Sequence, residues 1–339
     1  MDSISQWVLW AWIAWALWAK KLWKKALRRW IAIATIPDLD VFIGPLLYPN
    51  NPILADFFHR GPMHSLLFCV LIAPIVAYII NRIHAWDRKT FFVWLGVSFA
   101  TLITHPLLDS LTNYGTKLLR PFTDTAYSLN SIFIVDPLYT LPFLWFIVAA
   151  LFAKTKQKIA KRATRGVVIS TLYLLIALGI KFYAQAQFVQ ARADQDIICE
   201  QSFTTPEIMQ VLLQKHVAVC DDEIYQGRYS IFDTQSPSFI THPIQEELLA
   251  PYLSDTNVIQ VYKRTWWYGL YRSWVDGLWA YDMRFGQIAG WNSTGDAFSF
   301  FAYRIEQWSD GLRVQQSSPA EQRLPARPFH ILRERMQGN

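Results

Sequence analysis

The segment His59–Ser65 concentrates groups that can do chemistry. It holds two imidazoles, a guanidinium and a hydroxyl within seven residues, and an apolar run follows at once. A glycine–proline pair between the two histidines breaks the chain, so both imidazoles can turn inward from the mouth of a helix. Two further segments, Pro37–Asp40 and Thr104–Asp109, place ionisable groups in or beside apolar runs. Such groups are costly there unless they serve a function, so we interpret the three segments as parts of one site.

The spacing of these residues is typical of metal ligands. His105 and Asp109 are four residues apart in a helical run, so both project from one face. Asp38 and Asp40 flank a leucine, and in an extended segment both carboxylates would point the same way. Nitrogen and oxygen ligands without thiolates suit zinc, manganese, iron or magnesium. We therefore predict one or two divalent cations, zinc first among them, with six ligands: Asp38, Asp40, His59, His64, His105 and Asp109.

A divalent cation at this place would lower the pKa of a water molecule and supply hydroxide at neutral pH. Asp136 and Asp38 are candidate general bases, and Arg60 is a candidate for binding an anionic substrate group such as a phosphate. Each group also has a plainer interpretation. Asp136 could cap a helix, Arg60 could reach to lipid headgroups, and the histidines could be polar contacts between helices. The set as a whole predicts metal-dependent hydrolysis of a phosphoester or lipid-like substrate.

The two halves of the chain differ in composition. The first half is mostly apolar, whereas the second is mixed, polar and rich in turn signals. We predict a polytopic α-helical membrane domain over residues 1–190 and a soluble α+β, mainly β, extracytoplasmic domain over residues 191–339. The net charge of +6 lies largely in clusters between apolar runs, which indicates membrane topology rather than nucleic-acid binding. The expected partners are therefore membrane lipids and a hydrolysable substrate, with no nucleic acid.

Apolar runs predict the membrane spans of a multi-pass membrane protein. The first run is short and rich in tryptophan, and it ends in lysines rather than at a small-residue cleavage site, so no signal peptide is expected. Loops rich in lysine and arginine favour the cytoplasmic side of a membrane. If successive loops alternate between the two sides, every strongly basic loop falls on the cytoplasmic side. This alternation places the C-terminal half outside and brings the site residues near the outer interface. The runs are residues 4–19, 63–81, 90–112, 132–153 and 165–187.

The C-terminal half carries strand and hairpin signals. The alternation over Val258–Lys263 predicts a strand. An aspartate–glycine pair between aromatic flanks predicts a hairpin over residues 273–285. A second hairpin is expected over residues 208–232, with its turn at Asp221-Asp222. The half therefore reads as mainly β.

The cysteines and one charged pair of the tail have structural interpretations. Cys69 lies in an apolar run and is expected to be an inert core thiol. Cys199 and Cys220 could form a disulfide if their half faces an oxidising space. Asp282 and Arg284 are expected to form a structural ion pair rather than a second site.

The order of motifs resembles a known family. In that order they are similar to the membrane-bound, metal-dependent hydrolases of bacteria, a LexA-regulated family of the inner membrane. The resemblance covers most of the chain and implies a metal-dependent hydrolase. The chain departs from the family in its first helix, where Trp15 and other indoles stand in place of small or acidic residues. The matching stretches are Met1–Ser3, Thr35–Asp40, His59–Ser65, His105–Asp109, Thr112–Thr116, Pro121–Phe122, Val135–Pro137 and Tyr281–Gly286.

A non-enzymatic function is the alternative. The same residues could stabilise a membrane scaffold through a metal, or belong to a transporter-like protein whose tail binds partners. An ion pathway needs polar residues on both sides of the bilayer midplane. Here they lie mostly on one side, which favours a site over a channel.

Overall fold

A computed structural model describes most of the chain. The first apolar run, with Trp15, lies outside the described residues, and so does Asp276 of the predicted hairpin turn. The chain divides into two compact units, one with residues up to Pro49 and Ala55–Ala177, the other with Asn50–Leu54 and the residues from Leu178. The described ranges are residues 32–83, 88–152, 155–265, 268–274, 277–285, 301–309, 311–317 and 328–338.

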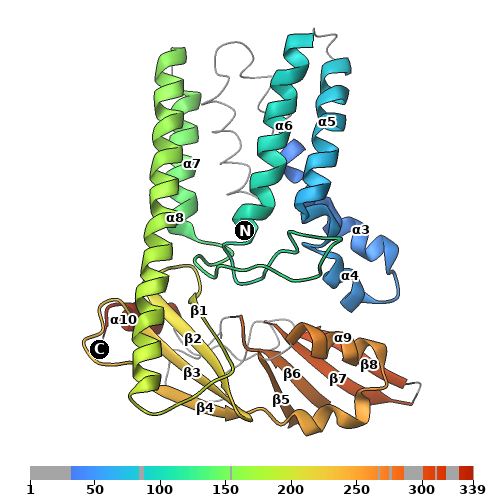
Figure 1. The fold of residues 1–339 in the computed structure, drawn as a ribbon, viewed down its shortest axis with the longest axis vertical. Coiled ribbons are helices and arrows are strands. Elements are labelled where there is room, and N and C mark those ends of the chain that lie inside the picture. The colour runs from blue at the N-terminus through green and yellow to red at the C-terminus, as the bar shows by residue number, and fades with distance from the viewer. Residues whose placement is uncertain are drawn as a thin grey trace. The chain divides into compact units, whose positions relative to one another are not determined.

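The N-terminal half is helical, as predicted (Figure 1). Two short 3-10 turns, η1 and η2, precede the helices that carry or adjoin the candidate site residues. Helix α8 continues from the first unit into the second, and the predicted domain boundary near residue 190 lies within it. The elements are η1 (Pro37–Leu39), α3 (Asp40–Leu47), α4 (Pro52–Phe58), η2 (Pro62–His64), α5 (Leu66–Ile83), α6 (Arg88–Asp109), α7 (Pro137–Leu151) and α8 (Lys156–Ala193).

Three of these helices are long and apolar enough to cross a membrane. They are Leu66–Ile83, Arg88–Asp109 and Thr164–Ala193, and they overlap the predicted spans at residues 63–81, 90–112 and 165–187. The run predicted at residues 132–153 forms only the 15-residue helix α7, which is shorter than the roughly 20 residues that a span needs.

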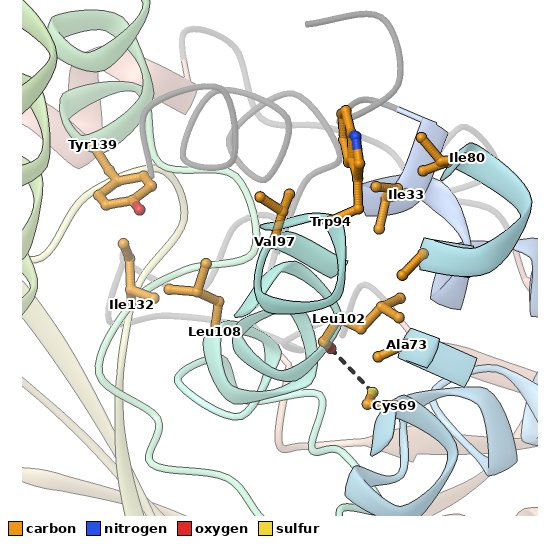
Figure 2. Packing of buried hydrophobic residues seen from close by; sticks show 11 residues of the cluster. Ile33, Cys69, Ala73, Ile80, Trp94, Val97, Leu102, Leu108, Ile132 and Tyr139 are labelled. Carbon is orange, nitrogen blue, oxygen red and sulfur yellow. Dashed lines mark hydrogen bonds between the residues drawn. The ribbon is translucent and has the colours of Figure 1, made fainter. Parts of the chain in front are cut away.

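Helices α5 and α6 pack against each other and fix the site between their ends. Cys69, Ala73 and Ala77 of α5 are fully buried at every fourth position, and small side chains at this spacing let two helices approach closely. Figure 2 shows Cys69 and Ala73 facing Leu102 of α6. The Cys69 thiol donates to the Leu102 carbonyl oxygen at 3.0 Å. The expected buried core thiol is therefore confirmed.

The C-terminal half is mainly β, as predicted. Its described residues form two four-stranded antiparallel sheets in which sequential strands are neighbours, together with three short helices. The first sheet holds β1 (Gln201–Pro206), β2 (Leu213–Cys220), β3 (Glu223–Ser230) and β4 (Phe239–Pro243). The second holds β5 (Gly269–Trp274), β6 (Gly277–Asp282), β7 (Ala302–Trp308) and β8 (Gly311–Ser317). The helices are η3 (Glu246–Tyr252), α9 (Thr256–Thr265) and α10 (Pro328–Met336).

Both predicted hairpins are confirmed. Strands β2 and β3 pair around Asp221-Asp222, where Asp221 adopts a φ of 52°, and a positive φ suits a two-residue hairpin turn. Strands β5 and β6 pair with Trp274 opposite Gly277. The first hairpin is shorter than expected because Gln210 bonds to the backbone of Leu213 and forms a turn before β2.

The strand predicted over Val258–Lys263 is wrong, because this segment lies in helix α9. The Asp255 carboxylate accepts hydrogen bonds from the backbone N–H groups of Asn257 and Val258, which caps the helix. Val258, Val261 and Thr265 are buried at helical spacing. The apolar pattern of this segment was compatible with both a strand period and a helix period. The Asp255 cap and the tertiary packing of Val258 and Val261 favoured the helix.

The structure decides one open question about the tail and confirms one prediction. Cys199 and Cys220 form a disulfide. The guanidinium of Arg284 donates to both carboxylate oxygens of Asp282, at 2.9 and 2.6 Å. A two-point pair of this kind fixes its geometry, so the predicted structural ion pair is confirmed.

The buried imidazole of His216 makes stability depend on pH. Its ring stacks on Phe188, and its Nδ1 lies 2.9 Å from the Thr204 hydroxyl. Burial, with the charges of Arg192 and Lys181, lowers the pKa of His216 from 6.5 to about 3. The folded state therefore binds this proton less well than the unfolded state. The stability it contributes is complete above pH 6.5 and is lost as the pH falls toward 3.

Thermal and denaturant unfolding of the full chain in detergent will test this effect. When the pH is lowered from 7 to 5, we expect the unfolding free energy of the wild type to fall by about 2 kcal/mol because of His216. The variant His216→Gln, which keeps a polar group for Thr204, is expected to lack this loss. Equal pH dependence in the two proteins would contradict the assignment.

Candidate metal site

Four of the six predicted ligands converge. Asp38 of η1, His64 of η2, and His105 and Asp109 of α6 each offer one ligand atom, and these atoms all lie within 4.8 Å of one another. We call these four residues the metal-site cluster. His64, His105 and Asp109 are buried, whereas the Asp38 side chain is 20% exposed. His64 lies just before the first residue of α5 and Asp109 is the last residue of α6, so the cluster sits at one end of two candidate spans.

The distances within the cluster suit a small cation. His64 Nε2 lies 3.5 Å from Asp38 Oδ1 and 3.3 Å from Asp109 Oδ2. His105 Nε2 lies 3.2 and 3.6 Å from the same two oxygens. Ligand atoms at about 2.1 Å from a tetrahedral zinc ion are about 3.4 Å apart. The four nitrogen–oxygen distances fall around this value.

The bonding of His64 supports the same interpretation. Both of its ring nitrogens are buried, and neither makes a hydrogen bond of normal geometry within the described part of the chain. Asp40 lies 2.9 Å from Nδ1, and two further carboxylates lie 3.3 and 3.5 Å from Nε2. A buried polar atom without such a bond is costly. A cation between His64 and the carboxylates would satisfy Nε2, so the residues present fit a metal ion.

The ring of His105 is oriented by the backbone. Its Nδ1 lies 2.9 Å from the carbonyl oxygen of Ala34. A carbonyl oxygen can only accept, so Nδ1 carries a proton. Nε2 faces Asp38 Oδ1 at 3.2 Å, and in the neutral ring it keeps its lone pair, which can bind a cation placed between the two atoms. Metal-bound histidines are commonly held by a second hydrogen bond of this kind.

Asp40 and His59 lie behind His64 rather than in the cluster. Asp40 Oδ2 is 2.9 Å from His64 Nδ1, and Asp40 Oδ1 is 2.8 Å from His59 Nδ1. The backbone N–H of Arg60 also donates to Asp40 Oδ2, at 2.9 Å. A carboxylate on Nδ1 keeps the proton there and leaves Nε2 as the ligand atom.

The expectation that Asp38 and Asp40 point the same way is wrong. Asp38 lies in the 3-10 turn η1, and Asp40 begins helix α3. Helical residues two apart do not face each other, whereas the prediction assumed an extended segment. One carboxylate therefore joins the cluster and the other supports it from behind.

Arg60 is held by the ligand Asp109. Its Nη2 lies 3.3 Å from Asp109 Oδ1, its Nη1 donates to the Thr112 hydroxyl at 2.9 Å, and its guanidinium lies over the Tyr114 ring. Its side chain is buried. This geometry assigns Arg60 to positioning Asp109, and its predicted contact with an anionic substrate group stays a prediction.

The chain reverses sharply at Arg60-Gly61 to make these contacts. Arg60 adopts a φ of 53°, which non-glycine residues rarely do. A Cβ on Gly61 would lie 2.7 Å from the carbonyl oxygen of Phe58, so the position requires glycine. The turn aims the Arg60 N–H at Asp40 and its side chain at Asp109.

Asp136 caps a helix. One of its carboxylate oxygens accepts the N–H groups of Leu138 and Tyr139 at the start of α7, and the other accepts the Tyr173 hydroxyl at 2.7 Å. The contacts of Asp136 are therefore those of a helix cap, which was the structural alternative to its role as a general base. Asp38, the partly exposed member of the cluster, is the better placed of the two candidate bases.

The charges of the site compensate one another. Burial opposes a charge on His64, but Asp109, Asp38 and Asp40 outweigh burial and raise the pKa of His64 to about 10. Burial by itself would raise the pKa of Asp38 and of Asp40, because it disfavours a charged carboxylate. Contacts with histidines nevertheless hold the pKa of Asp38 and of Asp40 below the usual range. A cation would replace the His64 proton in balancing these carboxylates.

Sequence reasoning missed three supporting groups. They are the carbonyl of Ala34, the hydroxyl of Thr112 and the ring of Tyr114. Thr112 and Tyr114 belong to a stretch already noted for its resemblance, and polar residues directly after Asp109 were a usable signal. A backbone carbonyl leaves no signal in a sequence.

Replacing Asp40 by asparagine will test its supporting role. An amide can present its N–H₂ to Nδ1 and favour the wrong tautomer of His64, so we expect the affinity for zinc to fall about 10- to 100-fold. Competition with a chromophoric chelator measures this. His59→Gln, one step further from the cluster, is expected to have a smaller effect. An unchanged affinity in Asp40→Asn would contradict the role.

Comparison with known proteins places the chain in a family. The family model described as YdjM inner membrane protein matches residues 1–188, which is more than half of the 339 residues. The chain therefore belongs to the YdjM inner membrane protein family. This confirms the predicted membership of an inner-membrane protein family; the description names no reaction, so the metal-dependent hydrolase stays a prediction. Neither the curated proteins nor the solved structures gave a match.

Proposed function

We propose that this member of the YdjM inner membrane protein family is a metal-dependent hydrolase that acts on a phosphoester or lipid-like substrate at the membrane surface. One observation carries the proposal. Two imidazole nitrogens and two carboxylate oxygens, from three separate elements, meet within 4.8 Å at the ends of two candidate spans. Intramembrane ionisable groups are expensive and commonly functional.

The residues of the site would divide the work. A bound divalent cation, zinc foremost, would polarise an ester or phosphoryl oxygen and lower the pKa of a water molecule. His64 and His105 present Nε2 because Asp40 and the Ala34 carbonyl hold their other nitrogens. Asp38 is the partly exposed member of the cluster, with its side chain 20% exposed, and its carboxylate would accept the proton of the attacking water.

The proposed location is the bacterial inner membrane, with several spans and the C-terminal half outside. The basic loops support this orientation when α7 crosses the membrane as a further span, although its 15 residues are fewer than the roughly 20 of a typical span. The Cys199–Cys220 disulfide supports it as well, because disulfides persist in the oxidising periplasm and are rare in the cytoplasm. The metal-site cluster would then lie at the outer interface.

Turnover by the purified full chain in detergent will test the proposal. A panel of phosphodiesters, phosphomonoesters and carboxylic esters should include at least one that is hydrolysed, with loss of activity on chelation and recovery on adding zinc or manganese. His64→Ala should be inactive, whereas His330→Ala, a change at an exposed histidine of α10, should not. A metal-loaded protein that hydrolyses no member of the panel would count against the proposal.

The number of ligands supports a second candidate function. Four protein ligands fill a tetrahedral zinc site, and closed four-ligand sites are usually structural. The metal would then only join η1, η2 and α6 in a membrane scaffold. In that case, chelation should lower the unfolding temperature, while no substrate is turned over under any metal condition.

A further inference from the structure

Helix α3 has two faces of different character. Asp40 and Gly44, one turn apart, are buried. A Cβ on Gly44 would lie 2.5 Å from the carbonyl oxygen of Ala55, so the glycine lets α3 lie directly against the chain of α4. This face holds α3 next to the metal-site cluster, since Asp40 contacts His64.

The other face of α3 is apolar and exposed. Phe42 and Leu46, four residues apart, are 74% and 80% exposed, and Val41 and Leu47 are also exposed. The segment Val41–Leu47 contains no charged residue. Side chains of this size are rarely left together in water without a partner.

The apolar face continues onto a candidate span. Leu67, Val70 and Leu71, in the first turns of α5, are exposed, and α5 is long enough to cross a membrane. Asp40, the first residue of α3, lies 2.9 Å from His64, which stands two residues before α5, so α3 begins next to that end of α5 (Figure 1). The apolar surface of α3 thus lies next to the exposed apolar side chains of a candidate span.

A second segment exposes apolar side chains at the same end of α5. The backbone N–H of Leu66 donates to the carbonyl oxygen of Leu118 at 2.9 Å, so the chain after α6 runs beside the start of α5. Just beyond this contact, Phe122 is 82% exposed and Leu119 is also exposed.

We infer that α3, with Leu119 and Phe122, lies in the lipid headgroup region and holds the metal-site cluster at the bilayer surface. The helix has eight residues, about 12 Å in length, so it can lie in the interface but cannot span the membrane. An apolar face of this kind commonly sinks to the boundary between headgroups and acyl chains. The occupant of the face is therefore lipid, rather than a second copy of the chain or another protein.

The inference narrows the substrate class, and this step rests on the proposed function. Asp38, the exposed member of the cluster, lies two residues before α3. A substrate that reaches Asp38 past α3 would be an amphiphile whose chains stay in the bilayer while its polar ester or phosphoester enters the site.

Site-specific fluorescence will test the location of α3. The chain has three cysteines; Cys199 and Cys220 are bridged and Cys69 is buried, so one introduced cysteine can be labelled selectively. Phe42→Cys and Leu46→Cys would carry an environment-sensitive dye, with the full chain in vesicles of phosphatidylethanolamine and phosphatidylglycerol. Ile75→Cys, at an exposed position inside α5, and Ile198→Cys, which is 87% exposed in the polar half, are the deep-lipid and water references.

We expect dyes at positions 42 and 46 to be quenched by lipids that carry a nitroxide near the headgroup and to lose most iodide quenching relative to position 198. Two results would overturn the inference. Quenching like that at position 198 would place α3 in water. Protection from both iodide and nitroxide lipids would mean that protein covers the face. Neither readout involves metal or turnover, so a failed hydrolase assay leaves this test intact.

Discussion

Replacing His64 and His105 together by alanine is expected to abolish metal binding. Both imidazoles present Nε2 to the same two carboxylate oxygens, so the variant keeps only Asp38 and Asp109 of the metal-site cluster. Loss of a supporting partner alone costs about 10- to 100-fold in metal affinity, and loss of two direct ligands should exceed about 100-fold. Elemental analysis of the purified full chain, after exposure to zinc and gel filtration, measures the result.

The design needs a control for folding, because His64 also balances three carboxylates. His105→Gln keeps a polar side chain of similar reach for the Ala34 carbonyl, and it should lose metal while keeping the elution volume of the wild type. His330→Ala removes an exposed histidine and should keep full metal content. Equal, negligible metal in all four proteins would remove the basis for a metal centre.

Replacing Arg60 by methionine is expected to have the largest effect on stability. The guanidinium and Asp109 are both buried, so the change removes one of the two cationic groups beside this carboxylate and leaves only His64, 3.3 Å from Asp109 Oδ2. Breaking a buried pair in this way costs about 3–5 kcal/mol. Denaturant unfolding of the metal-free full chain in detergent measures the change. Added zinc should recover more stability in the variant than in the wild type, because the ion also neutralises Asp109.

Arg120→Met is the matched control for this experiment. Arg120 pairs with Asp124 at 2.6 Å, but the two side chains are 31% and 71% exposed. An exposed pair contributes less than about 1 kcal/mol. A loss in Arg60→Met no larger than in Arg120→Met would show that Arg60 does not hold Asp109.

These two experiments probe different layers of one site. The first removes atoms that would touch the ion, whereas the second removes a group that acts through Asp109. A metal centre predicts loss of binding in the first and a zinc-dependent stability difference in the second. Polar contact between helices without an ion predicts that zinc changes neither protein.

The sequence predicted the residues of the site better than their roles. Paired spacing in α6 was enough to bring His105 and Asp109 to one face, because helix geometry is local. For Asp38 and Asp40 the local conformation was assumed to be extended, and the 3-10 turn at Pro37–Leu39 separated their directions. Which member of such a pair enters a cluster depends on backbone dihedrals that a two-residue spacing does not determine.

Composition was enough to predict a helical first half and a mainly β second half, but it did not predict helix α9. Apolar length predicts membrane helices because lipid leaves no alternative for the backbone, and the two β hairpins carried their own turn signals. Residues 258–263 fitted a strand and a helix equally well. Burial of Val258 and Val261 on one side of α9 depends on distant parts of the chain and decided the period.

By itself, the sequence determined that nitrogen and oxygen ligands would stand beside apolar spans, because side-chain chemistry and hydropathy are written residue by residue. Only the tertiary structure decided that Asp40 supports His64 and that Arg60 holds Asp109. The first contact joins residues 24 positions apart in the chain and the second joins residues 49 positions apart. They form because the close packing of α5 on α6 and the turn at Gly61 bring those segments together, and no short-range pattern records such an approach.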